Sequence, residues 1–472
     1  MARTFSGKKP KRLGYTVKTF LSYLGRHKFL LLAVGVLVAV SAIANLLGTY
    51  MIRPVVNALV SGNMETLIQG IALTVVIYGI GVLCSFGYTQ TMVRAAQKIL
   101  RDIRRDLFVH LQTLPLGFFD TNRKGDLMSL FTNDVDTISD ALNNSFAMII
   151  QSFVQVVGTL ALLFILNWRL TLIVVLGYAA MFLYIRYSGR RSRFYYNRQQ
   201  SSLGELDAYI EEMVSGQKVV KVFNHEEANL QGFAERNEQL RRAGVSAQSY
   251  AATMIPAVVS ISYINYAITC CVGGLLAIRS GDLGGLAAFL QYTRQVSQPI
   301  TQISQQVNTI LSAVAGAERV FEVMEAQPEV DEGKVTLVRA TEDRSGNLAE
   351  ASYDTGAWAW KKPDGTLVPV RGDVRFDHVV FGYDDRKIVL HDISLYAKPG
   401  QKIAFVGSTG AGKTTITSLI NRFYEIQSGT ITYDGIDVRD IEKDSLRRSL
   451  GVVLQDTHLF TGTVADNIRY GR

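Results

Sequence analysis

The run Gly407-Ser408-Thr409-Gly410-Ala411-Gly412-Lys413-Thr414 matches the phosphate-binding pattern G-x-x-x-x-G-K-[ST] at every fixed position. The preceding residues 401–406 end in four apolar residues and predict a buried strand, and residues 414–423 predict a helix. The glycines let the loop turn its backbone N–H groups inward, where they and the helix N-terminus bind a polyphosphate. In this pattern Lys413 reaches the β- and γ-phosphates and the Thr414 hydroxyl binds Mg2+. We therefore predict a phosphate site formed by Gly407, Ser408, Thr409, Gly410, Ala411, Gly412, Lys413, Thr414 and Thr415.

Composition indicates a membrane protein with more than one domain. The chain has 472 residues, too many for one ordinary core, and 48% of them are hydrophobic. The 49 Lys and Arg residues, against 41 Asp and Glu, lie beside long apolar runs, which favours the positive-inside rule over a nucleic-acid partner. Cys84, Cys270 and Cys271 lie in apolar runs without disulfide or metal-ligand spacing. The basic N-terminus lacks the pattern of a cleavable signal peptide.

Six apolar runs precede the phosphate loop, each near or above the ~20 residues that cross a membrane. They are 29–50, 67–88, 146–166, 170–187, 252–278 and 286–312. The sixth is rich in Gln and is the least hydrophobic, and a soluble helical bundle is disfavoured by the number of runs. Residues 15–26 are amphipathic and either lie along the inner membrane surface or begin the first span.

Two of the connections between these runs are long and basic, namely 94–143 and 186–248. The positive-inside rule places them, with both chain ends, on the cytoplasmic side. They predict helices that continue past the membrane, and the helical pattern breaks at 114–120 and again at 213–217. These breaks are either contact elbows for another domain or plain bends in a helical hairpin.

Beyond residue 330 the chain becomes polar and predicts a soluble α/β domain. Residues 356–360 and 366–370 flank Pro363-Asp364-Gly365 and predict a β-hairpin. Further strands are predicted at 374–376, 379–381, 429–433 and 451–454. The expected organisation is an N-terminal segment 1–26, a membrane domain 27–327, a linker with the hairpin 328–372, and a nucleotide-binding part 373–472.

With these motifs in view, the chain resembles an ATP-binding cassette (ABC) exporter half-transporter of the multidrug and lipid exporter type. The resemblance covers nearly the whole chain apart from the Trp-containing insert. Phe381-Gly382-Tyr383 resembles the aromatic loop, 452–456 the glutamine loop, and 459–468 the stretch that follows that loop. Residues 118–127 resemble the first coupling-helix region and 211–226 the second. The implied fold is multi-domain: an α-helical domain of six transmembrane helices, then an α/β P-loop nucleotide-binding domain.

The resemblance implies roles for individual residues. ATP and Mg2+ would be the cofactors, with Tyr383 stacking on adenine and Gln455 contacting Mg2+ or the attacking water. Lys413 and Gln455 would be catalytic, and Thr414 and Gln455 would hold the metal. A dimer in a bacterial plasma membrane, with its cassettes in the cytoplasm, would couple ATP hydrolysis to export of a drug-like or lipid-like molecule. The alternative is a nucleotide-binding, non-hydrolysing regulatory half of a heterodimer.

The sequence also departs from the family. No signature sequence, Asp-Glu strand (Walker B) or histidine switch follows Gln455 before Arg472. We therefore expect the cassette to be incomplete, from a fragment or a broken gene, and negligible turnover by this polypeptide alone. The insert 335–369 either adds its hairpin to an edge of the cassette sheet, favouring a heterodimer, or is a tolerated surface insertion.

Glutamines repeat at four-three spacing along the last apolar run and share one helix face with a nearby arginine. A charge at that depth usually faces water, a ligand or another subunit. We expect this polar stripe either to line a cargo cavity or to make interhelical hydrogen bonds. Its members are Gln291, Arg294, Gln295, Gln298, Gln302 and Gln305.

Overall fold

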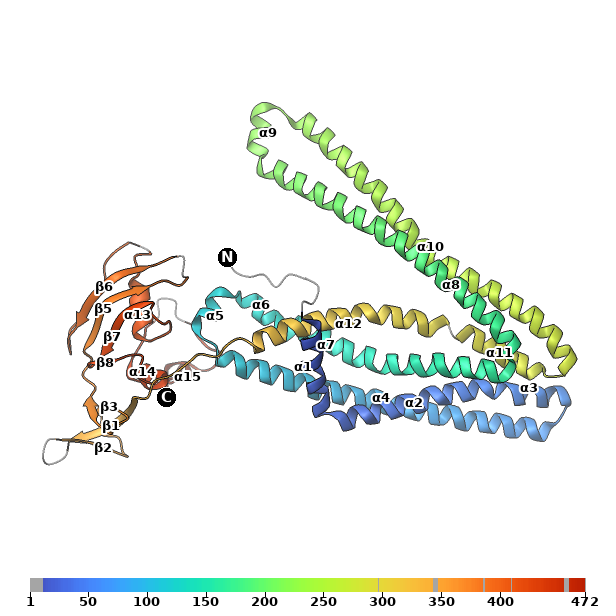
Figure 1. The fold of residues 1–472 in the computed structure, drawn as a ribbon, viewed down its shortest axis with the longest axis horizontal. Coiled ribbons are helices and arrows are strands. Elements are labelled where there is room, and N and C mark those ends of the chain that lie inside the picture. The colour runs from blue at the N-terminus through green and yellow to red at the C-terminus, as the bar shows by residue number, and fades with distance from the viewer. Residues whose placement is uncertain are drawn as a thin grey trace. The chain divides into compact units, whose positions relative to one another are not determined.

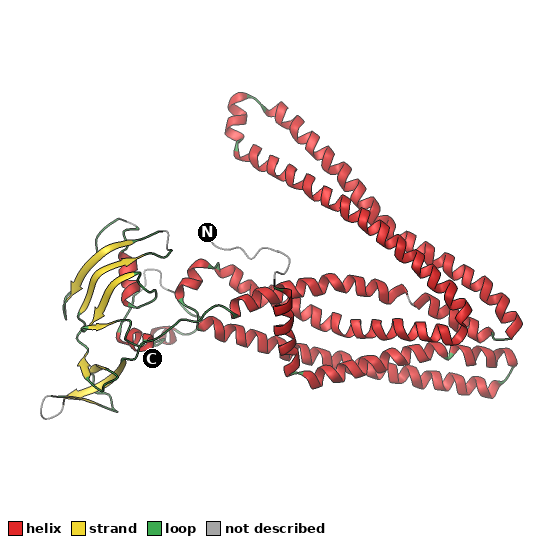
Figure 2. Cartoon of the chain, in the orientation of Figure 1, coloured by secondary structure: helices red, strands yellow, loops and turns green. Residues whose placement is uncertain are grey.

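The computed structural model describes residues 12–295, 297–342, 347–384, 387–408, 410–453 and 458–471. The chain forms two compact units. The helical unit contains Pro10–Ile103 and Asp134–Glu318, and the mixed unit contains Arg104–Asn133 together with Arg319–Arg472. Both sheets belong to the mixed unit, as the yellow strands in Figure 2 show. Helices followed by sheets is the order that the sequence predicts.

Long helices build the helical unit, because a helix satisfies its backbone hydrogen bonds internally where no water is present. Two of them, α4 and α12, continue into the mixed unit. The helices are α1 (Leu13–Arg26), α2 (Lys28–Tyr50), α3 (Ile52–Ser61), α4 (Met64–Gln112), α7 (Val135–Asp140), α8 (Ala147–Ser215), α9 (Gln217–Phe223), α10 (Glu226–Ser280), α11 (Leu283–Gln295) and α12 (Ser297–Met324). Short π-helical turns, Leu130–Asp134 and Ala141–Phe146, flank α7.

Within the described residues, four helical segments are long and apolar enough to cross a membrane: Lys28–Ser61, Met64–Gln112, Lys124–Ser215 and Glu226–Ser280. The third holds two predicted spans, which the non-helical residue Asn167 separates (φ −162°, ψ 101°). The Asn167 side-chain oxygen accepts hydrogen bonds from the N–H groups of Arg169 and Leu170 and so restarts the helix. The predicted sixth span covers parts of α11 and α12 and is not among the four found within the described residues.

Helices α8 and α10 run side by side as an antiparallel pair, with α9 at its end (Figure 1). Tyr195 stacks on Tyr250 with ring centroids 5.1 Å apart, and the Tyr196 hydroxyl donates to Gln248 at 3.2 Å. The predicted break at 213–217 is the junction of α8 and α9. The long basic connection 186–248 is therefore helical, as predicted, and the chain turns back at α9.

Small residues and polar side chains fix how the helices of this unit pack. A Cβ on Gly177 would lie 2.3 Å from Asn265, whose side-chain N–H donates to the Val174 carbonyl at 3.4 Å. The Tyr292 hydroxyl donates to the Leu46 carbonyl at 2.6 Å. Lipid is as apolar as leucine, so close backbone approach and such hydrogen bonds, rather than hydrophobic burial, hold membrane helices together.

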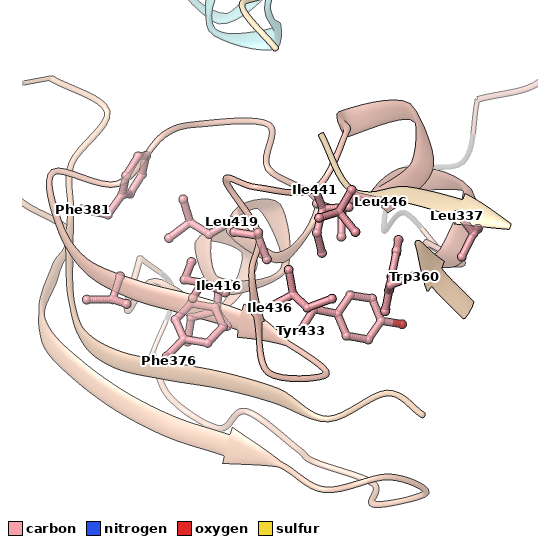
Figure 3. Packing of buried hydrophobic residues seen from close by; sticks show 14 of the residues in the cluster. Leu337, Trp360, Phe376, Phe381, Ile416, Leu419, Tyr433, Ile436, Ile441 and Leu446 are labelled. Atoms are coloured by element: carbon pink, nitrogen blue, oxygen red, sulfur yellow. The ribbon is translucent and has the colours of Figure 1, made fainter. Parts of the chain in front are cut away.

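The larger sheet of the mixed unit is antiparallel, with the order β6-β5-β7-β8. Its strands are β5 (Val374–Phe381), β6 (Leu390–Ala397), β7 (Ser428–Tyr433) and β8 (Ile436–Asp437). Strand β5 joins the two strands predicted at 374–381, with an irregular register around His378 (φ 48°). Figure 3 shows Phe376, Leu419 and Leu446 in the core shared with α13 (Lys413–Ile420) and α14 (Lys443–Ser449). This core positions the N-terminus of α13.

The predicted hairpin is present as β3 (Trp358–Lys361) and β4 (Leu367–Pro369). It does not add to an edge of the larger sheet. It forms a second sheet, order β2-β1-β3-β4, with β1 (Thr336–Glu342) and β2 (Leu348–Glu350). Trp360 is fully buried in the common core against Tyr433, and its indole N–H donates to Asp434 at 3.1 Å. One aromatic anchor therefore attaches the insert, which sequence alternation alone did not reveal.

Two predicted strands are wrong. Residues 401–406 and Gly451–Val453 are not strands, and Leu454 lies outside the described residues. Val406 is 94% exposed and Val453 is 98% exposed. A strand exists only where a neighbouring strand accepts and donates its backbone hydrogen bonds, and the described part of the chain supplies none here. Apolar patterning detects the tendency but not the partner.

Candidate nucleotide-binding site

The phosphate loop ends at the start of α13, as its motif requires. Gly410 (φ 89°) and Gly412 (φ 88°) adopt the left-handed conformation that glycine tolerates best. A Cβ on Gly412 would also lie 2.6 Å from Leu390. Helix α13 begins at Lys413, so its first N–H groups face the loop. Thr409, also predicted for this site, lies outside the described residues.

Lys413 folds back over the loop. Its ammonium group donates to the carbonyls of Gly407 and Ser408, both at 2.8 Å. The Ala411 N–H donates to the Ser408 carbonyl at 3.2 Å, which closes a turn. The Thr414 side chain is exposed next to these groups. The ammonium, the helix N-terminus and the Thr414 hydroxyl suit a polyphosphate with Mg2+, because anions bind helix N-termini and a hydroxyl is a hard oxygen ligand.

Tyr383 lies beside α13, and about half of its side chain is exposed (53%). Its hydroxyl shares a hydrogen bond of 3.1 Å with Thr415, one of the predicted loop residues. The ring packs edge-on against Phe381 and Tyr424, at 5.0 Å between centroids in each case. Gln427 fixes the preceding backbone, since its amide both donates to and accepts from Gly382 at 2.9 Å. An exposed, anchored ring next to a phosphate loop has the chemistry to stack on a base.

Tyr424 extends this aromatic group to α5 (Leu116–Thr121), which belongs to the same unit. Its hydroxyl donates to Asp120. Burial and this hydrogen bond raise the pKa of Tyr424. A Cβ on Gly117 would lie 3.6 Å from the Tyr424 ring. The structure thus brings the predicted elbow 114–120 against the residues that follow the phosphate-loop helix.

The segment that leaves α12 is tied to α14 by ion pairs. Glu329 accepts from Arg447 at 2.5 and 3.0 Å and from Lys443 at 3.2 Å, and its N–H donates to the Thr113 carbonyl at 2.7 Å. Burial opposes ionisation, but the bonds and charges of Arg447 and Lys443 lower the pKa of Glu329. Buried Arg422 adds an ion pair to Asp331 at 3.4 Å. Glu329 therefore connects the linker both to α14 and to Thr113, the residue before the elbow.

Comparison with known proteins identifies the family to which the helical region and the phosphate-loop region belong. Residues 31–300 match the family described as ABC transporter transmembrane region, and residues 390–471 match ABC transporter. The chain belongs to the ABC transporter family. Its membrane and nucleotide-binding regions follow one another in the exporter order, which confirms the predicted fold class and the resemblance to an exporter half-transporter.

Three relatives show how far the similarity extends. The uncharacterized ABC transporter ATP-binding protein YfiC of Bacillus subtilis is 36% identical over 97% of this chain and 71% of its own length. A fatty acid ABC transporter ATP-binding/permease protein of Mycobacterium bovis is 35% identical over 85% of this chain, which spans 59% of that protein. An ATP-dependent lipid A-core flippase of Syntrophus aciditrophicus is 29% identical over 89% of this chain and 66% of its own length.

ABC family membership supports an integral membrane protein that binds ATP and, in general, an ATPase-coupled transporter that works as a dimer. Gln455, predicted to contact Mg2+ or water, lies outside the described residues and stays a prediction. Sequence reasoning missed Tyr424 and Glu329. The aromatic triplet formed with Phe381 and Tyr383 joins residues that are distant in sequence, and an isolated Glu in a linker carries no local signal.

The described residues of the polar stripe differ in exposure: Gln295 is partly buried, whereas three others are exposed. Gln295 donates to the Thr49 hydroxyl at 3.1 Å, which fits interhelical bonding, although its side-chain oxygen is buried without a partner among the described residues. Gln291, Arg294 and Gln302 are exposed, and the Arg294 guanidinium lies 5.7 Å from the Tyr266 ring centroid. The side chains of Gln298 and Gln305 lie outside the described residues.

Proposed function

We propose that this protein is one half of a dimeric exporter that couples binding and hydrolysis of Mg-ATP to the movement of an amphiphilic, lipid-like molecule across a bacterial plasma membrane. The observation that carries the proposal is the continuous set of contacts from the phosphate loop to the elbow. Thr415 bonds to Tyr383, Tyr383 packs on Tyr424, and Tyr424 donates to Asp120. Nucleotide occupancy at the loop can therefore bias the position of α5.

Each residue in the site has a defined task in this proposal. Lys413 and the α13 N-terminus hold the β- and γ-phosphates, and Thr414 holds Mg2+, whose charge would offset that of the phosphates. Gln455 completes the metal or water contact. Tyr383 stacks on adenine through the exposed part of its ring, which gives affinity with little base specificity. These roles rest on the exposed loop geometry and the family pattern together.

The nature of the cargo is supported by the printed functions of relatives and by the polar stripe. Two relatives are named for fatty acid and lipid A-core transport, both acyl-chain molecules with polar heads. Exposed Arg294, with Gln291 and Gln302, offers a cation and amides to such a head. The insert forms its own sheet and does not extend the larger one, so it gives no reason to favour a heterodimer. The partner in this function is a second half-transporter, either identical or different.

Nucleotide binding by the purified 472-residue chain tests the proposal directly. Equilibrium binding of a fluorescent ATP analogue with Mg2+ should be lost, by at least tenfold in affinity, in Lys413→Ala. Lys402→Ala removes an exposed lysine from the same segment and should bind as the original chain does. Equal affinity in all three proteins would refute the assigned phosphate site.

Transport is tested separately in lipid vesicles. A fluorescent fatty acid or lysophospholipid should change leaflets faster in vesicles that contain the intact dimeric transporter and Mg-ATP than in vesicles that contain it with ADP. Arg294→Gln should slow this movement while leaving nucleotide affinity unchanged. Nucleotide binding without any movement of either probe would contradict the transport proposal but leave the nucleotide site standing.

A further inference from the structure

A cluster of arginines follows directly on the apolar part of α8. Before it the helix presents exposed apolar side chains, such as Leu176 and Phe182, which suit lipid. The next turns present Arg186, Arg190, Arg191 and Arg193, all exposed. At a rise of about 1.5 Å per residue, the helix passes from the last exposed leucine, Leu183, to Arg190 in about 10 Å. We call residues 183–194 the arginine belt.

The arginine belt has a groove with both apolar and cationic walls. Leu183, Arg186, Tyr187, Arg190, Arg191 and Phe194 line a volume of about 530 Å³. Positions 183, 187, 190, 191 and 194 share one helix face. Tyr187 and Phe194 are each 58% exposed, and the Arg191 guanidinium lies 5.9 Å from the Tyr187 ring centroid. Aromatic rings interleaved with arginines at the end of an apolar segment are typical of a membrane interface.

Among the residues that the structure describes, no acidic group pairs with these arginines. Helix α8 contains no Asp or Glu from Ala147 to Gln200. The neighbouring helix α10 meets the belt end at Tyr250, and its sequence from Gln248 to Val259 is also free of acidic residues. Within the described part of the chain, none of Arg186, Arg190, Arg191 and Arg193 makes an ion pair. Four guanidinium groups without an acidic partner form a positive surface that attracts anions and can donate paired hydrogen bonds to them.

We propose that the arginine belt binds an anionic phospholipid of the surrounding bilayer. The phosphate lies between Arg190 and Arg191, where a guanidinium donates two parallel hydrogen bonds to phosphate oxygens. The rings of Tyr187 and Phe194 lie at headgroup depth, and the acyl chains follow Leu183 and Phe182 along the apolar surface. The separation of about 10 Å between Leu183 and Arg190 accommodates a glycerol backbone between chain and phosphate. This proposal rests on α8 crossing the membrane and does not depend on what the protein transports.

The test counts lipids that stay bound to the protein. The chain is purified in a mild detergent and mixed with phosphatidylglycerol or with phosphatidylcholine of the same acyl chains, and bound lipids are resolved by native mass spectrometry. Each arginine near a charged lipid surface is worth about 1 kcal/mol, which is about fivefold in affinity. Arg190→Gln/Arg191→Gln should therefore weaken phosphatidylglycerol binding about 25-fold. It should leave the much weaker phosphatidylcholine binding unchanged.

A matched control removes two other exposed arginines. Arg241 and Arg242 lie on α10 and pair with Glu238, at 2.7 and 2.8 Å. Arg241→Gln/Arg242→Gln lowers the net charge equally and should keep phosphatidylglycerol binding. An equal loss in both double variants would mean adsorption through net charge only and would overturn the proposal.

A second copy of the chain is the competing occupant of the belt. If Arg190→Gln/Arg191→Gln changed the dimer fraction measured by light scattering while lipid binding stayed the same, the belt would be a subunit interface and the proposal would be wrong. The proposed transport function would stand in either case, because nucleotide binding and cargo movement are measured independently of these variants. Raising the salt concentration should weaken lipid binding in the original chain, since surface charges are screened.

Discussion

Replacing Tyr424 by phenylalanine isolates the hydrogen bond that joins α5 to the phosphate-loop side of the unit. The substitution keeps the ring, and with it the packing on Phe381 and Tyr383 at 5.8 and 5.0 Å, and removes only the hydroxyl that donates to Asp120. A hydrogen bond to a charged group contributes about 1.5–3 kcal/mol. Because Asp120 is exposed to solvent, which weakens interactions with its charge, we expect a value below this range, about 1 kcal/mol. That corresponds to about fivefold in the local opening equilibrium of α5.

Hydrogen exchange measures this opening directly in the membrane-reconstituted protein. The amides of α5, which lie in residues 116–121, should exchange about fivefold faster in Tyr424→Phe, whereas amides in α13 should be unaffected. Tyr396→Phe is the matched control, because Tyr396 is exposed on β6. Asp120→Ala should produce a similar change, and the double variant should be no worse than either single one. Additive effects, or no change in α5, would refute the contact as a link between nucleotide and elbow.

Three further predictions concern stability. Trp360→Ala should lower the free energy of unfolding of the mixed unit by about 3–5 kcal/mol in denaturant titrations, because the ring is fully buried, whereas the partly exposed Trp358→Ala should cost less. The pKa of Glu329 is lowered in the folded protein, so its stabilising effect is complete above the unfolded pKa of about 4.3 and is lost as the pH falls through the folded pKa. Glu329→Gln should therefore remove this part of the acid sensitivity. The melting temperature, measured between about pH 3 and 6, should depend less on pH in the variant than in the original protein. Gly284→Ala places a Cβ 2.1 Å from the Arg53 carbonyl and should lower the melting temperature, whereas Gly274→Ala, with open space around it, should not.

The sequence predicted the parts of this protein whose signals are local. The phosphate loop, the amphipathic first helix and the hairpin around Gly365 each depend on residues within one short window. Positive φ at Gly410 and Gly412 follows from the motif itself. The helix predicted at 414–423 ends earlier, at Ile420, because Arg422 turns the chain with φ 51° and uses its guanidinium to bind the carbonyl of Ile441 at 3.0 Å.

Features that depend on distant partners were not predictable in the same way. Residues 401–406 have strand-like composition, but no neighbouring strand in the described part of the chain completes their hydrogen bonds. Trp360 was recognised only as a strand residue, and its place in the core depends on Tyr433 and Asp434 from another sheet. The elbow 114–120 was visible as a broken helical pattern, but its contact with Tyr424 required the folded chain.

The division of the chain into units has a practical consequence for isolating the nucleotide-binding part. Its contacts include a segment from early in the chain, Arg104–Asn133, that a soluble fragment beginning at the linker would lack. Such a fragment would expose the Tyr424 ring and leave the Glu329 N–H without the Thr113 carbonyl. A chimeric protein in which residues 104–133 are fused ahead of residue 319 should be the more soluble preparation for binding studies.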